Sequence, residues 1–241
     1  MRVFITGDKH GSFTELIDFC NSRELTSEDY VIILGDVGFN YYLNIKDSIN
    51  KEKVHNNTKC TFICIHGNHE ERPCNISSYK LKYNEILHCN CWVEDDYPRI
   101  LFPEDGYMKL FDKTYLILGG AYSIDKQIRI IYGYNWFSSE QMPDETMNKI
   151  LDLIKDINHF NFVLSHTCPL KYEPRHKFLS GLDQSTIDKR MEIFFDKVDD
   201  LITYDYWYFG HYHGDEQISD NVYLMFNSYK LIDSDIPIFT F

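Results

Sequence analysis

The chain has 241 residues and a formal net charge of −13, with 37 acidic against 24 basic side chains. Its 44% apolar and 25% charged residues are typical of a soluble globular protein. The negative net charge argues against non-specific binding of long nucleic acid. No segment approaches the roughly 20 apolar residues of a membrane span, no signal peptide precedes the first apolar run, and seven cysteines without paired spacing favour free thiols. We therefore expect a cytoplasmic protein with a single domain over residues 1–241.

Short apolar runs and helical periods alternate through the first 65 residues. The predicted order is a strand over 2–7, a helix that begins at a capping box in 12–15, a strand over 30–35, a helix over 43–54 and a strand over 61–65. Because strands that alternate with helices pair in parallel, this order predicts a layered α/β sheet.

The remaining chain has a less regular pattern. Residues 70–98 mix proline, asparagine and cysteine without a period and predict an irregular segment. The elements expected after it are a hairpin of 107–111 with 114–118, a helix over 147–157, a strand over 161–165, a long helix capped by Ser185 and Asp188, and strands over 206–210, 222–227 and 236–240.

Five of the apolar runs are followed at once by histidine, aspartate or asparagine. These stretches are 4–11, 31–36, 62–70, 162–166 and 207–213. Ligands in open α/β folds bind where strands leave the sheet, so the polar residues at these ends are expected to meet. They are Asp8, His10, Asp36, Asn68, His69, His166, His211 and His213.

Carboxylates, imidazoles and an amide oxygen are ligands for divalent transition metals. A pair of metal ions needs a carboxylate that bridges them, terminal ligands on each side and open positions for substrate. The set therefore predicts a cofactor of two divalent transition-metal ions. Manganese is the first choice, and iron, zinc, cobalt and nickel are alternatives.

The order Asp-x-His, Gly-Asp, Gly-Asn-His-Glu, His and Gly-His-x-His, from residue 8 to residue 213, resembles the calcineurin-like metallophosphoesterase superfamily. The resemblance implies a four-layer α-β-β-α sandwich, in which helices flank two packed mixed sheets. It also implies that one metal is held by Asp8, His10, Asp36 and His213. The other would be held by Asp36, Asn68, His166 and His211. Asp36 then bridges the two ions, and His69 lies beside the reacting phosphate as a catalytic acid or hydrogen-bond donor.

Three departures from the family pattern show which branch of the superfamily the chain resembles. Phe39 stands where many members have a second aspartate, and the Arg-Gly that often follows is missing. The missing Arg-Gly argues against the protein Ser/Thr phosphatase branch and the related dinucleoside tetraphosphate hydrolases. Residues 119–140 are similar to a segment of bacterial and phage members of the superfamily. Glu70 replaces a common aspartate, which is a mild exchange.

Residues 119–140 combine aromatic and basic side chains without a clear period. We predict that four of them bind substrate, namely Tyr122, Lys126, Arg129 and Trp136. The alternative is a structural loop held by aromatic packing.

The predicted function is hydrolysis of a phosphate mono- or diester by a hydroxide that bridges two metal ions. The expected substrate is a small phosphorylated molecule, nucleotides included, and neither a membrane nor long nucleic acid is an expected partner. Two alternatives stay open: a nuclease that acts on oligonucleotide ends, and a catalytically inactive metal-binding interaction module.

Overall fold

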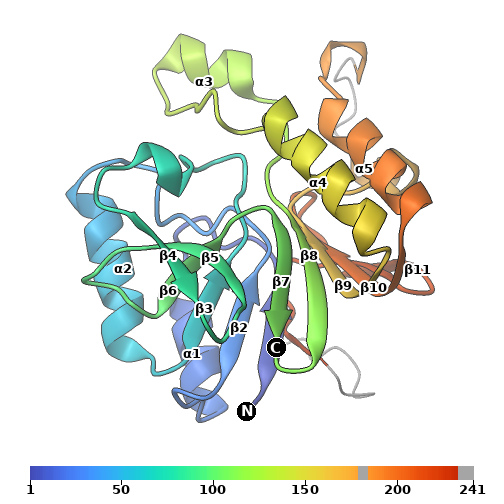
Figure 1. The fold of residues 1–241 in the computed structure, drawn as a ribbon. Coiled ribbons are helices and arrows are strands. Elements are labelled where there is room, and N and C mark those ends of the chain that lie inside the picture. Colours follow the sequence, from blue (N-terminus) through green and yellow to red (C-terminus); the bar gives the residue numbers. More distant parts are fainter. Residues whose placement is uncertain (179–183, 233–241) are drawn as a thin grey trace.

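Two β-sheets form the centre of the protein (Figure 1). The computed structural model describes residues 1–178 and 184–232. From edge to edge, the first sheet contains β13 (Lys230–Leu231), β1 (Val3–Thr6), β2 (Tyr30–Ile33), β3 (Thr61–Cys64), β6 (Ile100–Pro103), β5 (Cys89–Val93) and β4 (Lys80–Asn84). The second contains β11 (Glu216–Ser219), β12 (Val222–Leu224), β10 (Thr203–Phe209), β9 (His159–Ser165), β8 (Lys113–Leu118) and β7 (Gly106–Leu110). Each sheet has both parallel and antiparallel pairs.

Helices cover the outer face of each sheet (Figure 1). The α-helices are α1 (Thr14–Ser22), α2 (Ile45–Asn57), α3 (Lys126–Tyr132), α4 (Asp144–Asp156) and α5 (Arg190–Leu201). Short 3₁₀ helices occupy Pro73–Asn75, Leu170–Tyr172, Arg175–Lys177 and Gln184–Thr186. α1 and α2 lie on the first sheet, and α4 and α5 lie on the second, whereas α3 projects beyond the layers.

Alternating side chains place the core on both faces of each sheet. In β2, Ile32 packs into the cluster between the sheets, whereas Val31 packs under α1. In β9, Leu164 points to the same central cluster, and Val163 packs against α4 and α5. These three layers of buried side chains confirm the expected four-layer α-β-β-α sandwich.

Parallel strands bring the predicted metal ligands to the same edge of the two sheets. β1, β2 and β3 are parallel neighbours, and β9 and β10 are parallel neighbours in the facing sheet. Their carboxyl ends therefore emerge together, as the sequence predicts for the five polar ends.

The structure differs from the prediction where a hydrophobic period is weak. β4 and β5 pair as a hairpin inside 70–98, and the exposed side chains of β4 give it no buried face to recognise. α3 has no buried residue at all, so residues 119–140 show no helical stripe. The predicted strand over 236–240 lies outside the described residues.

Both predicted N-terminal caps are wrong. α1 begins at Thr14 with Phe13 at the N-cap position and no side-chain cap, because the Ser12 N–H donates to the Lys9 carbonyl within a tight turn. α5 begins at Arg190, later than Ser185 implies, and there the Asp188 carboxylate accepts the Arg190 N–H at 3.0 Å. Turn geometry outweighed the capping pattern in both places.

Across the described residues, none of the helices has the length and apolar character needed to cross a membrane.

Candidate metal centre

Tight turns hold the predicted ligands at the strand ends. Asp36 and His10 each have φ 46°, His211 has φ 69° and His213 has φ 48°. A non-glycine residue in this left-handed region costs about 1–3 kcal/mol and is typical of functional sites. Strain is therefore concentrated at the predicted centre.

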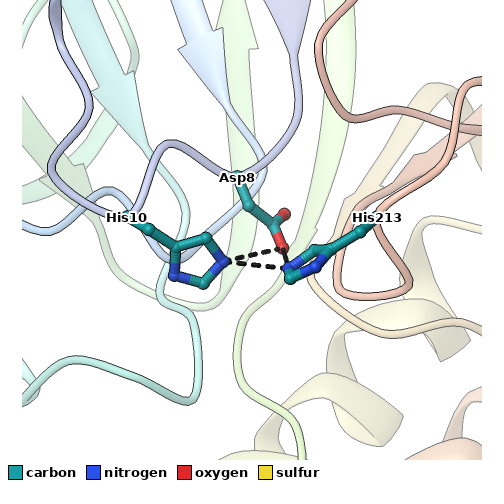
Figure 2. Close-up of side chains that lie close together, drawn as sticks. All are labelled: Asp8, His10 and His213. Carbon is teal, nitrogen blue, oxygen red and sulfur yellow. Dashed lines mark hydrogen bonds and ion pairs between the residues drawn. The ribbon is translucent and has the colours of Figure 1, made fainter.

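Asp8, His10 and His213 form one group of potential ligands (Figure 2). The two Nε2 atoms of His10 and His213 lie 2.9 Å apart, and Oδ2 of Asp8 lies 3.3 Å from Nε2 of His213 and 3.8 Å from that of His10. Figure 2 shows both rings turned toward this carboxylate. The hydrogen bond that the His213 ring donates to the Asp8 carboxylate raises the pKa of His213, against the effect of burial. Ligand atoms within 4.8 Å of one another suit a single ion.

Asp8, Asp36 and His166 form a second group, which is buried. Nε2 of His166 lies 3.5 Å from Oδ2 of Asp36, and that oxygen also lies 3.9 Å from Nε2 of His10. Although burial opposes ionisation, the neighbouring His166 ring holds the pKa of Asp36 well below its usual range. Asp36 is therefore an ionised carboxylate between the two groups.

The buried group fits a metal ion because its ligand atoms converge. Nδ1 of His166 lies 2.7 Å from the Leu34 carbonyl oxygen and must donate to it. Nε2 of the same ring lies 2.8 Å from Oδ1 of Asn68. That amide is fixed, because its Nδ2 donates to Oγ of Ser123 at 2.9 Å. Burial lowers the pKa of His166, but Asp36 outweighs it and raises the value to about 9, so without a cation the ring is protonated and Nε2 donates to Asn68. A divalent cation would take the place of this proton, because histidine binds metal through a deprotonated nitrogen.

His211 completes the buried side. Its backbone N–H donates to both carboxylate oxygens of Asp8, at 3.1 and 3.2 Å, and its Nδ1 lies 3.1 Å from Oδ1 of Asn68. Burial lowers the pKa of His211 well below its usual value, so the ring is neutral, as a metal ligand requires. The structure thus brings all seven predicted metal ligands to one place.

Two glycines are required by the close approach of the site carboxylates. A Cβ on Gly67 would collide with the Asp36 carboxylate and backbone nitrogen. A Cβ on Gly210 would collide with the Asp8 carboxylate. The glycine that precedes Asn68, and the one that precedes His211, therefore leave room for the carboxylates.

His69 lies at the open side of the centre. Its backbone N–H donates to Oδ1 of Asp36 at 2.8 Å, and its Nε2 is 3.9 Å from Oδ2 of the same carboxylate. The Arg129 guanidinium lies 3.5 Å from Nε2 of His69 and is held by Asp125 at 2.8 Å. Burial, opposed by Asp36 and reinforced by Arg129, lowers the pKa of His69. A neutral His69 ring and a cation thus stand beside the predicted metal positions.

Two clefts open from this centre, and Asp36 and His69 line both. The Tyr41 cleft, bounded by Tyr41, Tyr42, Lys46 and Arg129, has a volume of about 480 Å³. The Tyr122 cleft has a volume of about 370 Å³ and is bounded by Tyr122, Ile124, Phe178, Ile187, Glu192 and Tyr212. The centre therefore lies at the junction of two spaces that suit small molecules.

The four predicted substrate contacts divide between these clefts and the segment beside them. Arg129 lines the Tyr41 cleft and Tyr122 lines the other. Lys126 and Trp136 line neither cleft. They contact each other instead, and the Lys126 ammonium lies 4.1 Å from the centre of the Trp136 ring. The Trp136 indole donates to Glu140 at 2.8 Å. Glu140 in turn accepts from Ser123, the residue that orients Asn68.

Sequence reasoning missed the groups that orient the ligands. The Leu34 carbonyl fixes His166, and Ser123 fixes Asn68. A backbone carbonyl has no sequence signature, and one serine among many carries none either. The two residues that depart from the family pattern are both buried. Phe39 stacks on Phe13, with ring centroids 4.8 Å apart. Glu70 is fully buried, and this burial, together with the Asp36 charge, raises the pKa of its carboxyl to about 8.

Solved structures and one family model match most of this chain. One solved crystal structure aligns over 95% of this chain and 93% of its own length, with 11% sequence identity and a TM-score of 0.53. The structure of phosphopantetheinyl hydrolase (PptH) from Mycobacterium tuberculosis aligns over 93% of this chain and 88% of its own, with 12% identity and a TM-score of 0.44. No curated protein gives a significant match. The family model for calcineurin-like phosphoesterases matches residues 1–215, and the chain therefore belongs to the calcineurin-like phosphoesterase family.

Proposed function

We propose that the protein is a metal-dependent hydrolase of phosphate esters of small molecules. The observation that carries this proposal is the convergence of Nε2 of His166, Oδ1 of Asn68 and Oδ2 of Asp36 in a buried space, where all three can bind a cation. Membership of the family supports the reaction type. The side chains at the centre then have three roles: metal binding, hydrogen-bond donation and binding of a phosphoryl oxygen.

The ligands fall into two sets that share Asp36. One set consists of Asp8, His10, Asp36 and His213, and the other of Asp36, Asn68, His166 and His211. Divalent cations at such a site stabilise the charge of phosphoryl oxygens and lower the pKa of a coordinated water. Mn²⁺ is the first ion to test, and iron, zinc, cobalt and nickel suit the same donors.

His69 is proposed as the catalytic hydrogen-bond donor. It lines both clefts beside Asp36, and burial lowers the pKa of its ring. A neutral ring can donate one N–H to a phosphoryl or leaving-group oxygen, and such donation contributes about 10²–10⁴ in rate. Arg129, 3.5 Å from the same ring, is proposed to bind a phosphoryl oxygen.

The substrate is proposed to be a small phosphate mono- or diester. The two clefts give room for a group on either side of the phosphorus, which supports a diester as well as a monoester. A net charge of −13 opposes long nucleic acid. A nuclease acting on oligonucleotide ends and an inactive metal-binding module are the competing proposals.

Turnover of bis-p-nitrophenyl phosphate and p-nitrophenyl phosphate tests the proposal. Metal-stripped protein should be inactive, and added Mn²⁺ should restore release of p-nitrophenol. The variant His69→Ala should retain its metal content and lose about 10²–10⁴ in kcat. Saturated metal sites without turnover of either ester would refute the hydrolase and favour the inactive module. Cleavage of short oligonucleotides alone would favour the nuclease.

A further inference from the structure

We propose that the Tyr122 cleft binds a planar ring that carries an N–H donor, as a nucleobase does, and that Glu192 is the residue that selects it. This inference rests on the proposed function, because it names the organic part of the phosphate ester. It is carried by the position of Glu192, a buried carboxylate with one oxygen that has no partner.

The Tyr122 cleft has the room and the aromatic side chains for a flat ring. It begins at Asp36, His69 and His213, so a phosphate bound there can extend its substituent directly into it. The Phe178 and Tyr212 rings lie nearly parallel, with centroids 6.0 Å apart and an interplanar angle of 19°. Aromatic side chains that line a cleft favour stacking by a planar group, although the Lys189 ammonium also lies 5.1 Å from the centre of the Phe178 ring. A volume of about 370 Å³ suits a nucleoside.

Glu192 is a buried carboxylate in the wall of this cleft, which Asp125, Lys177 and Lys189 also line. The residue is only 3% exposed, and its Oε1 accepts from the Thr167 hydroxyl at 2.8 Å. Its Oε2 is buried and has no hydrogen-bond partner among the described residues. A buried carboxylate oxygen without a donor is costly, so its presence in a cleft indicates a ligand that provides the donor.

The hydroxyl groups near Glu192 already donate their protons to acceptors other than its Oε2. The single Thr167 hydroxyl proton goes to Glu192, so the Tyr212 hydroxyl, 3.1 Å from the Thr167 oxygen, must donate its own proton to Thr167. The Lys189 ammonium donates one of its three N–H groups to Glu173 at 2.6 Å and makes no hydrogen bond to Oε2 of Glu192. We infer that a molecule in the cleft supplies the donor for Oε2.

A substrate-side experiment tests the contact in the unaltered protein. The p-nitrophenyl phosphodiesters of the four nucleosides are compared with methyl p-nitrophenyl phosphate, which has no ring in that position. At least one nucleoside ester should have a kcat/KM about tenfold or more above the methyl ester. N-methylation of the donor nitrogen of the preferred base should remove that advantage.

A variant-side experiment assigns the preference to Glu192. In Glu192→Gln the ratio of kcat/KM for the preferred nucleoside ester to that for the methyl ester should fall about tenfold. The exposed exchange Glu145→Gln on α4 is the matched control and should leave the ratio unchanged. Calorimetric binding of the nucleoside monophosphate should weaken in Glu192→Gln by a similar factor.

The outcomes separate this inference from the proposed function. Turnover of the methyl ester without preference for any nucleoside ester would overturn the inference and leave the hydrolase intact. A preference that survives both N-methylation and Glu192→Gln would overturn the role of Glu192. Loss of turnover for every ester with metal bound would overturn the hydrolase and this inference with it.

Discussion

The orientation of Asn68 by Ser123 gives a quantitative prediction. Ser123 is 1% exposed, and its hydroxyl accepts from Nδ2 of Asn68 at 2.9 Å and also bonds to Glu140. Ser123→Ala leaves the buried amide N–H without an acceptor, which costs about 1–3 kcal/mol in the free energy of unfolding. It also frees Asn68 to rotate, and loss of an orienting partner lowers metal affinity about 10–100-fold.

Two assays measure this effect. Calorimetric titration of metal-stripped protein with Mn²⁺ should show one weakened site in Ser123→Ala, and urea unfolding should show the loss of stability. Ser22→Ala on the exposed end of α1 removes a serine hydroxyl far from the centre and should change neither value beyond about 0.5 kcal/mol. If Ser123→Ala binds two ions with wild-type affinity, Ser123 does not orient the ligand and the reasoning fails.

Two further predictions follow from packing and from burial. Gly67→Ala should cost about 1–3 kcal/mol and remove bound metal, because its Cβ collides with the Asp36 carboxylate. The control Gly133→Ala, where a Cβ meets nothing within 4 Å, should keep its metal. If elemental analysis finds as much metal in Gly67→Ala as in Gly133→Ala, the steric argument is contradicted. Burial raises the pKa of Glu192 from 4.5 to about 7, so the carboxyl's favourable contribution is present in full below pH 4.5 and lost as the pH rises through about 7. Denaturation at a series of pH values should therefore show wild type losing up to about 3 kcal/mol relative to Glu192→Gln over this range, and a difference independent of pH would contradict it.

The sequence predicted those features that depend on local pattern. Buried strands have apolar runs, and the polar residue after each run marks the carboxyl end of a strand, so the positions of Asp36 and His166 could be placed from the sequence alone. The layers followed from strands and helices in alternation. Resemblance to a family then supplied the division of the ligands between two metal ions.

Other features depend on contacts between distant segments. β4 is exposed along its length, and α3 buries nothing, so neither gives a periodic signal. β5 does alternate, but its inward side chains are Cys89, Cys91 and Val93, a pattern too short to recognise. The partners of Asn68 and His166 are a serine 55 residues away and a carbonyl 132 residues away. Glu192 lies among apolar residues of α5, and only the folded chain shows that it lines a cleft.

The central claim is that two ions share Asp36. Elemental analysis of protein reloaded with Mn²⁺ tests it most directly in wild type, Asp36→Asn and the exposed control Asp152→Asn. The account predicts two ions per chain in wild type and in the control, and one or none in Asp36→Asn. Two tightly bound ions in Asp36→Asn, or fewer than two in wild type at saturation, would contradict it.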